Sequence, residues 1–419
     1  MGKWQLFLVI FLGGLIIPAL GFLNPKYIVY LWTIVASIHL IIPEITIISN
    51  IKQTLYGAMC LCSLPVITIV FILNFKKMKK GFTFLWPIAG LILVAIFSSI
   101  KNHFLALETF RTAGGLYVFL LVNLFAYGFI KKNEDLKMLL IISIITSIVI
   151  SLHAIIDFLY FRQMTRHFGS TVRASSFFIQ NANALAHYVV FFLSLCLALF
   201  IKEKRIIYCL LVLFYLIVIV LTFSIAGFAA TAAAILLIFI YTGLYKNPVY
   251  LFNLFLLGAL LVVIFFQLGL IHHPAFYHVA TFGTFNFRSK IWPVAIKLII
   301  QQPFLGYTPK MYPLILGKAA HLSSSIAAHN FLLSFLLSYG IIGTGIIVRL
   351  FYNLYKKLKK SITLSSDSFV SSCSMGCICY MFSSFIYGIA HSFDINSVYI
   401  LPFWFISTSI TGIVDKENY

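Results

Sequence analysis

The stretch "IIYCLLVLFYLIVIVLTFS" (206–224) contains no charged residue and is long enough to cross a bilayer. A helix of about 20 apolar residues spans a hydrocarbon core of about 30 Å. Similar runs follow one another along almost the whole chain, which is 62% hydrophobic and only 10% charged. This balance excludes a water-soluble domain, and the runs are continuously apolar rather than alternating as in a β-barrel. The sequence therefore predicts an all-α, polytopic helical membrane protein.

Hydropathy predicts 12 or 13 transmembrane helices in a single integral membrane domain, residues 1–419. The count is open because the first two segments are joined only by "NPKY". The expected spans are 5–23, 27–49, 54–74, 82–100, 113–131, 138–160, 184–201, 206–224, 226–244, 249–271, 329–352, 368–390 and 394–414.

The net charge of +20 is largely explained by short basic loops between these spans. They are "KKMKK" (76–80), "KKNEDLK" (131–137), "KEKR" (202–205) and "KKLKK" (356–360). Such loops mark the cytoplasmic side of a membrane protein. The C-terminus is therefore predicted in the cytoplasm, residues 272–328 are predicted outside, and no nucleic-acid partner is expected.

The external loop 272–328 is long, and it is too apolar and aromatic to be disordered. It contains "NFRSKIWPVAIKLIIQQPFLGY" (286–307). We expect a short interfacial helix here, with Asn286 as its N-cap and with Pro303 and Gly306 just beyond its end.

The loop contains no Asp or Glu, which excludes a paired-carboxylate glycosidase mechanism within it. The three histidines of "HHPAFYH" (272–278) have no carboxylate or cysteine to complete or orient a zinc site, so we interpret them as interfacial. No metal and no cofactor is predicted. Cations are plentiful instead, including Arg173, Arg288 and Lys290. They suit lipid headgroups or a phosphate-bearing substrate.

The order of residues in this part of the chain resembles a known family. Arg288, Trp292, Pro303 and Gly306 are followed by His329-Asn330 and then by Gly340 and Gly343. This pattern is similar to the signature of the O-antigen ligase and Wzy-type polysaccharide polymerase superfamily. "RASSFFIQNANALAHY" (173–188) and "LTFSIAGFAATAA" (221–233) resemble upstream segments of the same family. The second departs from the pattern, because Ile225 stands where the family usually carries an arginine.

The resemblance implies metal-independent transfer of a glycan from undecaprenyl pyrophosphate to an acceptor hydroxyl. It assigns catalysis to His329 and Arg288, with substrate contacts from Arg173, Asn183, Asn330, Trp292 and Lys290. Physical chemistry agrees, because a pyrophosphate leaving group mainly needs positive charge, and a histidine at a helix N-terminus is favoured in its neutral, basic form.

Plainer interpretations remain open for each of these side chains. His329 and Arg288 could be interfacial residues at a span boundary, and Trp292 an interface anchor. Asn181 and Asn183 fit helix N-caps, while Asp394 at a span end is expected to pair with a nearby cation or water.

The leading hypothesis is a polymerase of lipid-linked repeat units, making a capsular, exopolysaccharide or O-antigen chain. It would act in the bacterial plasma membrane with its active site outside, beside a flippase and a chain-length regulator. The alternatives are an O-antigen-type ligase that uses lipid A core, protein or wall polymer as acceptor, and a lipid-linked oligosaccharide flippase. A flippase would favour ionisable residues deep in spans and an internal repeat, and neither is evident.

Overall fold

The structure is a computed structural model, and its contacts divide the chain into two compact units. Unit 1 contains Met1–Ile148, Ile291–Ser365 and Ser392–Tyr419, and unit 2 contains Val149–Lys290 and Ser366–His391. The residues that the structure describes are 20–37, 45–48, 51–53, 55–103, 106–161, 174–175, 179, 181–249, 283–322, 325–365, 367–395 and 397–417.

The predicted all-α polytopic membrane fold is confirmed. Seven helices of the described ranges are long and apolar enough to cross a membrane. All but the first residue of the segment 249–271 and most of 5–23 lie outside those ranges, so the predicted total of 12 or 13 spans stays a prediction.

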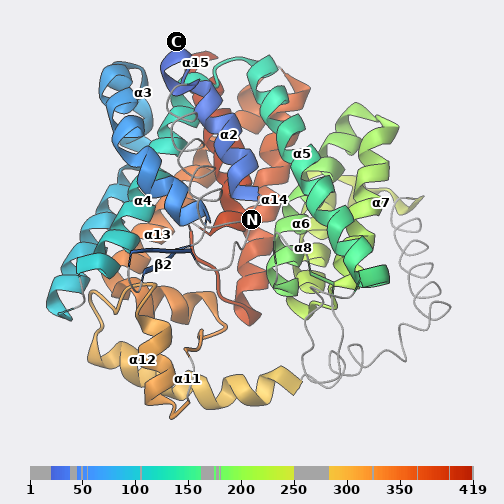
Figure 1. The fold of residues 1–419 in the computed structure, drawn as a ribbon. Coiled ribbons are helices and arrows are strands. Elements are labelled where there is room, and N and C mark those ends of the chain that lie inside the picture. Colours follow the sequence, from blue (N-terminus) through green and yellow to red (C-terminus); the bar gives the residue numbers. More distant parts are fainter. Residues whose placement is uncertain are drawn as a thin grey trace. The chain divides into compact units, whose positions relative to one another are not determined.

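Unit 1 is built on helices that run side by side (Figure 1). They are α2 (Lys26–Ser37), α3 (Leu55–Lys101), α4 (Ala106–Phe129), most of α5 (Asn133–Ile156), α13 (Phe331–Leu364) and α15 (Leu401–Glu417), with the 3-10 turn η4 (Val398–Ile400) before α15. Trp404 of α15 is fully buried, and its ring centroid lies 5.4 Å from those of Phe119 in α4 and Phe351 in α13. Aromatic packing of this kind joins three helices at one core position.

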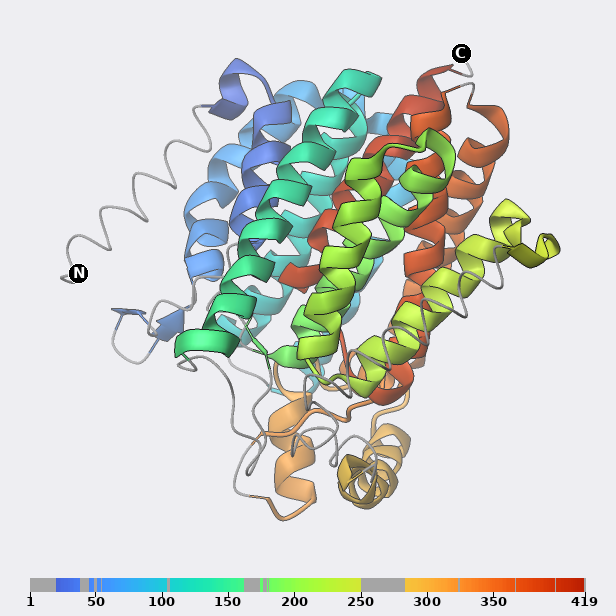
Figure 2. The ribbon, with the colours of Figure 1, turned by 90° about the vertical axis from the view of Figure 1, so that its right-hand side faces the viewer.

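Unit 2 is centred on α6 (Ala182–Glu203), which is buried along most of its length. Around it pack α7 (Ile206–Leu221), α8 (Ile225–Thr242) and α14 (Ser368–Ala390); α6, α7 and α8 appear in green in Figure 2. Two glycines allow the close approach, because a Cβ on Gly376 of α14 would lie 2.9 Å from the Leu195 backbone and one on Gly227 of α8 would lie 2.6 Å from Ala186. The unit also holds the π-helix η1 (Asp157–Phe161) and the 3-10 turn η2 (Leu244–Lys246).

Several predicted boundaries are wrong. The basic stretches 76–80 and 356–360 are helical, inside α3 and α13, because lysine and its neighbours there are good helix formers and no proline interrupts them. The expected span 27–49 ends at Ser37, and Ile45–Ile48 forms a strand, β1, that pairs antiparallel with β2 (Ile51–Gln53). β-Branched residues dominate this hairpin and favour strands over helix.

Candidate active site

The first feature of the site is a break in α13 at Gly340. This residue has φ 63° and ψ −168°, a conformation essentially restricted to glycine. The expected span 329–352 runs through this residue without a break, whereas the helix is interrupted at Gly340, resumes and continues to Leu364. Backbone groups near Gly340 therefore need partners outside the helix.

The loop Pro303–Thr308 supplies these partners by pairing its backbone with α13. Tyr307 N–H donates to the Leu337 carbonyl at 2.6 Å and Thr308 N–H to the Ser338 carbonyl at 2.8 Å. In return, Ile341 N–H donates to the Pro303 carbonyl at 2.7 Å and Ile342 N–H to that of Phe304 at 3.3 Å.

Gly306 lies at the centre of this pairing with φ 64°, and a Cβ there would lie 2.6 Å from the Leu337 carbonyl oxygen. Its own carbonyl accepts hydrogen bonds from Ser98 and Asn102 of α3, at 2.8 and 3.2 Å. The loop is thus clamped between α3 and the broken helix.

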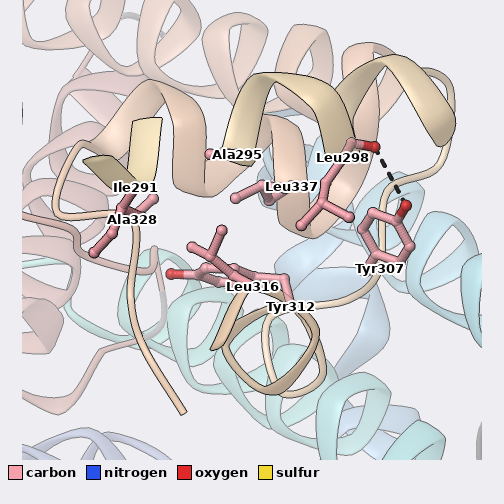
Figure 3. Close-up of a cluster of buried hydrophobic side chains, with 8 residues drawn as sticks. All are labelled: Ile291, Ala295, Leu298, Tyr307, Tyr312, Leu316, Ala328 and Leu337. Atoms are coloured by element: carbon pink, nitrogen blue, oxygen red, sulfur yellow. Dashed lines mark hydrogen bonds between the residues drawn. The ribbon is translucent and has the colours of Figure 1, made fainter. Parts of the chain in front are cut away.

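A small apolar core seats the loop helices on this clamp (Figure 3). α11 (Gly283–Gln301) and α12 (Tyr312–Ala319) contribute most of it, and the Tyr307 hydroxyl donates to the Leu298 carbonyl at 3.2 Å. The buried members are Ile291, Ala295, Leu298, Tyr307, Tyr312, Leu316, Ala328 and Leu337. The long loop is therefore a folded part of unit 1 from Ile291 onward, at the opposite end of the unit from the C-terminus (Figure 1).

α11 agrees only partly with the predicted interfacial helix. It ends at Gln301, just before Pro303, as expected, but it begins at Gly283, so the prediction of Asn286 as its N-cap is wrong. Ile296 and Ile300 are 49% and 71% exposed, which leaves an apolar surface opposite the buried residues.

His329 lies in a tight turn directly before α13, half-buried and with φ 50°. A positive φ is uncommon for a residue with a Cβ and marks a backbone that its surroundings hold in place. The next residue, Asn330, is the N-cap of α13, and its side-chain oxygen accepts from Leu333 N–H at 3.1 Å. This contact gives Asn330 a structural role, and its predicted substrate contact stays a prediction.

Trp292 fixes the same turn from α11. Its indole N–H donates to the carbonyl of Ala328, the residue before His329, at 3.0 Å. Trp292 was predicted to bind substrate or to anchor at the interface, and the structure shows it holding the backbone that carries His329.

A group of polar side chains close to the start of α13 was not predicted from the sequence. Tyr312 is buried and its hydroxyl lies 3.2 Å from Ser334 Oγ, which in turn donates to Ser392 Oγ at 2.7 Å. Nearby, burial raises the pKa of the Asp394 carboxyl to about 6, against the opposing effect of Lys310. Sequence placed Asp394 at the start of a span, but α15 begins only at Leu401, so Asp394 belongs to a loop.

Two predicted cations lie on the part of α11 that belongs to unit 2. Lys290 is exposed, whereas Arg288 is half-buried. Burial lowers the pKa of the Arg288 guanidinium, and the hydroxyl of Tyr387 in α14 opposes that shift. An anionic ligand would offset the cost of burying this cation.

The upstream family segments give a mixed result. Arg173 lies outside the described residues. Asn181 is the N-cap of α6 and accepts from the backbone of Asn183 and Ala184, so the capping interpretation is confirmed for Asn181, while Asn183 is the second helical residue. Ile225, in place of the family arginine, is the half-buried first residue of α8 behind the N-cap Ser224.

Unit 2 also contains a buried polar cluster that sequence analysis missed. His187 Nε2 lies 2.9 Å from Ser384 Oγ and 3.1 Å from the Tyr380 hydroxyl, and its ring stacks on Tyr387 at 4.2 Å. His187, six residues after the N-cap Asn181, gave no signal in the sequence, because its partners come from α14, nearly 200 residues away.

Within the described ranges there is no group of three or more histidine, cysteine, aspartate or glutamate side chains arranged to hold a metal ion. His272, His273 and His278 lie outside those ranges.

Comparison with known proteins supports the resemblance in sequence. Residues 209–348 match a family model described as O-antigen ligase. The match covers most of α7, all of α8, Arg288, the clamp at Gly306 and Gly340, and the His329 turn. No curated protein matches the chain.

Proposed function

We propose that this protein polymerises lipid-linked oligosaccharides, because residues 209–348 match the family model described as O-antigen ligase and the members of that family are glycan-transferring enzymes. The donor would be a glycan on undecaprenyl pyrophosphate. The acceptor would be a hydroxyl of the next lipid-linked unit. The reaction would take place at the external face of the bacterial plasma membrane, toward which the basic-loop pattern directs residues 272–328.

The observation that carries the proposal is the way the structure holds His329. Two hydrogen bonds restrain its turn, one from the Trp292 indole to Ala328 and one to the Asn330 cap, and the Gly306–Gly340 clamp anchors the helix that follows. A catalytic side chain needs this kind of fixed support. A histidine that merely ended a span would not need a hydrogen bond that ties the residue before it to another helix.

In the proposed reaction, the acceptor hydroxyl oxygen attacks the anomeric carbon of the donor sugar. The bond from that carbon to the pyrophosphate oxygen breaks, and its electron pair leaves with the pyrophosphate. His329 takes the hydroxyl proton as general base. Arg288, a half-buried cation, stabilises the negative charge that develops on the leaving group.

A ligase is the second candidate, favoured by the description of the matching family model. A ligase would pass a finished glycan from the same donor to lipid A core, protein or a wall polymer. Its chemistry at the histidine and at the leaving group would be the same, so the difference lies in the acceptor.

The test is substitution of His329 and of Arg288 by alanine in the full chain, expressed in cells that lack the native copy. We expect both variants to be present in the membrane at the wild-type level and to make no polymer. The matched control is Lys297→Ala, which removes an exposed cation from the same helix. Full-length polymer from either variant would refute that residue's role, and loss of polymer from Lys297→Ala would show that any charge change on α11 is harmful.

The lipid-linked material that accumulates distinguishes the functions. A defective polymerase leaves single repeat units on the carrier at the external face. A defective ligase leaves full-length glycan on the carrier there, and a defective flippase leaves single units on the cytoplasmic face.

A further inference from the structure

An unassigned cavity lies in unit 1, at the end that contains the C-terminus of α15. Its volume is about 520 Å³. It is formed by the residues that precede α2, by α3, by the ends of α4 and α15 and by the start of α5. The lining residues are Gly21, Phe22, Leu23, Asn24, Pro25, Lys26, Val70, Leu73, Asn74, Lys77, Phe129, Lys131, Lys132, Asp135 and Lys416.

The charge of this lining is strongly unbalanced. Five lysines face a single carboxylate, that of Asp135. Asp135 is already occupied, because Lys26 Nζ lies 2.9 Å from Oδ1 and the Tyr30 hydroxyl lies 3.5 Å from the same atom. Among the described residues of the lining, no second carboxylate balances the other four lysines.

Lys131 is held in place by two contacts. Its ammonium group lies 4.7 Å from the ring centroid of Tyr127 and 3.4 Å from the Gly412 carbonyl. Burial lowers its pKa, and the neighbouring Lys416 and Lys80 lower it further, although Asp415 acts in the opposite direction. An anion in the cavity would relieve this repulsion.

The cavity also has an apolar rim. Phe22, Leu23 and Leu73 line it and are 56%, 79% and 69% exposed. Apolar side chains beside a basic floor match a molecule with an anionic head and hydrocarbon chains. A soluble anion would use only the lysines.

We propose that this cavity binds the phosphate headgroup of an anionic membrane lipid, with Lys77, Lys131 and Lys132 on the phosphate and the acyl chains against Phe22, Leu23 and Leu73. Basic pockets between helices on the cytoplasmic side of membrane proteins commonly bind such headgroups. The site is distinct from the proposed active site. Lys357 pairs with Asp415 at this end of the unit. It lies toward the end of α13, 28 positions after His329, whereas His329 directly precedes the start of that helix.

The test measures binding of a fluorescent phosphatidylglycerol to the purified full-length protein in an uncharged detergent. The variant Lys77→Gln/Lys132→Gln removes two exposed cations from the cavity, and the control Lys76→Gln/Lys79→Gln removes two exposed cations from the same helix outside it. Since both lysines are exposed, neither change should affect folding, and size-exclusion profiles check this. We expect about 30-fold weaker binding to the cavity variant, from the usual contribution of a lysine near a lipid phosphate, and less than about threefold for the control.

Two further arms identify the ligand. Phosphatidylcholine should bind at least about tenfold more weakly than phosphatidylglycerol, because it carries no net charge. Glycerol 3-phosphate should not displace the lipid at equal concentration. Equal losses in the cavity and control variants, equal binding of the two lipids, or displacement by glycerol 3-phosphate would each overturn the assignment to an anionic lipid.

Discussion

The substitution Gly340→Ala tests whether the break in α13 is needed for the stability and activity of the protein. Gly340 has φ 63° and ψ −168°, a region that costs a residue with a Cβ about 1–3 kcal/mol. The added methyl group would also collide with the carbonyl group of Phe304, in the loop that pairs with the break.

The steric cost extends to the pairing itself. Moving Phe304 away strains the four backbone hydrogen bonds between 303–308 and α13, each worth about 0.5–1.5 kcal/mol. Alanine can avoid the collision only by giving up some of them. We therefore expect Gly340→Ala to reduce the free energy of unfolding by about 4 kcal/mol. We expect it to reduce glycan transfer as well, because the same helix begins directly after the His329 turn.

Gly345→Ala is the matched control on the same helix. A Cβ at Gly345 meets nothing within 4 Å, and this glycine is helical. Alanine is the better helix former by about 1 kcal/mol, so this variant should be slightly stabilised and fully active. The assay is thermal unfolding of the two purified variants in one detergent, together with polymer formation in cells. The reasoning is refuted if Gly340→Ala unfolds at the wild-type temperature, or if its unfolding temperature and polymer formation equal those of Gly345→Ala.

Three further predictions concern the candidate site and its mechanism. Trp292→Phe removes the indole N–H that donates to Ala328. It should lower the initial rate of transfer at least about tenfold, while thermal unfolding shows a loss of only about 1 kcal/mol of stability. An unchanged rate would mean that this hydrogen bond does not position His329. Burial raises the pKa of Asp394 from 3.8 to about 6, so the unfolded state loses its proton first as pH rises, and the free energy of unfolding should fall by up to about 3 kcal/mol between pH 4 and 6. Asp394→Asn should abolish that fall in unfolding curves recorded across this pH range, and an equal pH dependence in both proteins would refute the assignment. Activity in purified membranes should survive strong chelation, and a collapse with EDTA that Mg²⁺ restores would refute the metal-free mechanism.

The positions of many helices along the sequence were predictable, because hydropathy and span length are local properties of the chain. The predicted segments 184–201 and 368–390 lie within helices α6 and α14, and the segment 113–131 lies in α4 except for its last two residues. The cap at Asn181 was predictable for the same reason, since an asparagine before an apolar run is a local signal. Wrong boundaries arose where lysine-rich stretches continue a helix beyond the apolar run, as in α3.

The site was less predictable, because its decisive contacts join residues far apart in sequence. A glycine in an apolar helix is an ordinary feature of membrane proteins, and nothing near Gly340 indicates that the backbone of Phe304 fills its break. Asp394 was placed in a span by hydropathy, whereas its position in a loop near Lys310 and Tyr312 comes from tertiary packing. His187 was overlooked because its partners lie on another helix.

The motif that suggested the function divides, in the structure, into two groups with different tasks. Gly306 and Gly340 allow two backbones to meet, Asn330 caps the helix, and Trp292 ties α11 to the turn. These residues contribute geometry, and substitutions there should act through stability and rate together. Only His329 and Arg288 of the motif offer a titratable or charged group that this scaffold does not explain. The scaffold fixes His329 in a turn with a positive φ. The rate of the proposed reaction should therefore be more sensitive to the position of that imidazole than to any single phosphate contact. Displacing the turn without changing the histidine should cost nearly as much activity as His329→Ala.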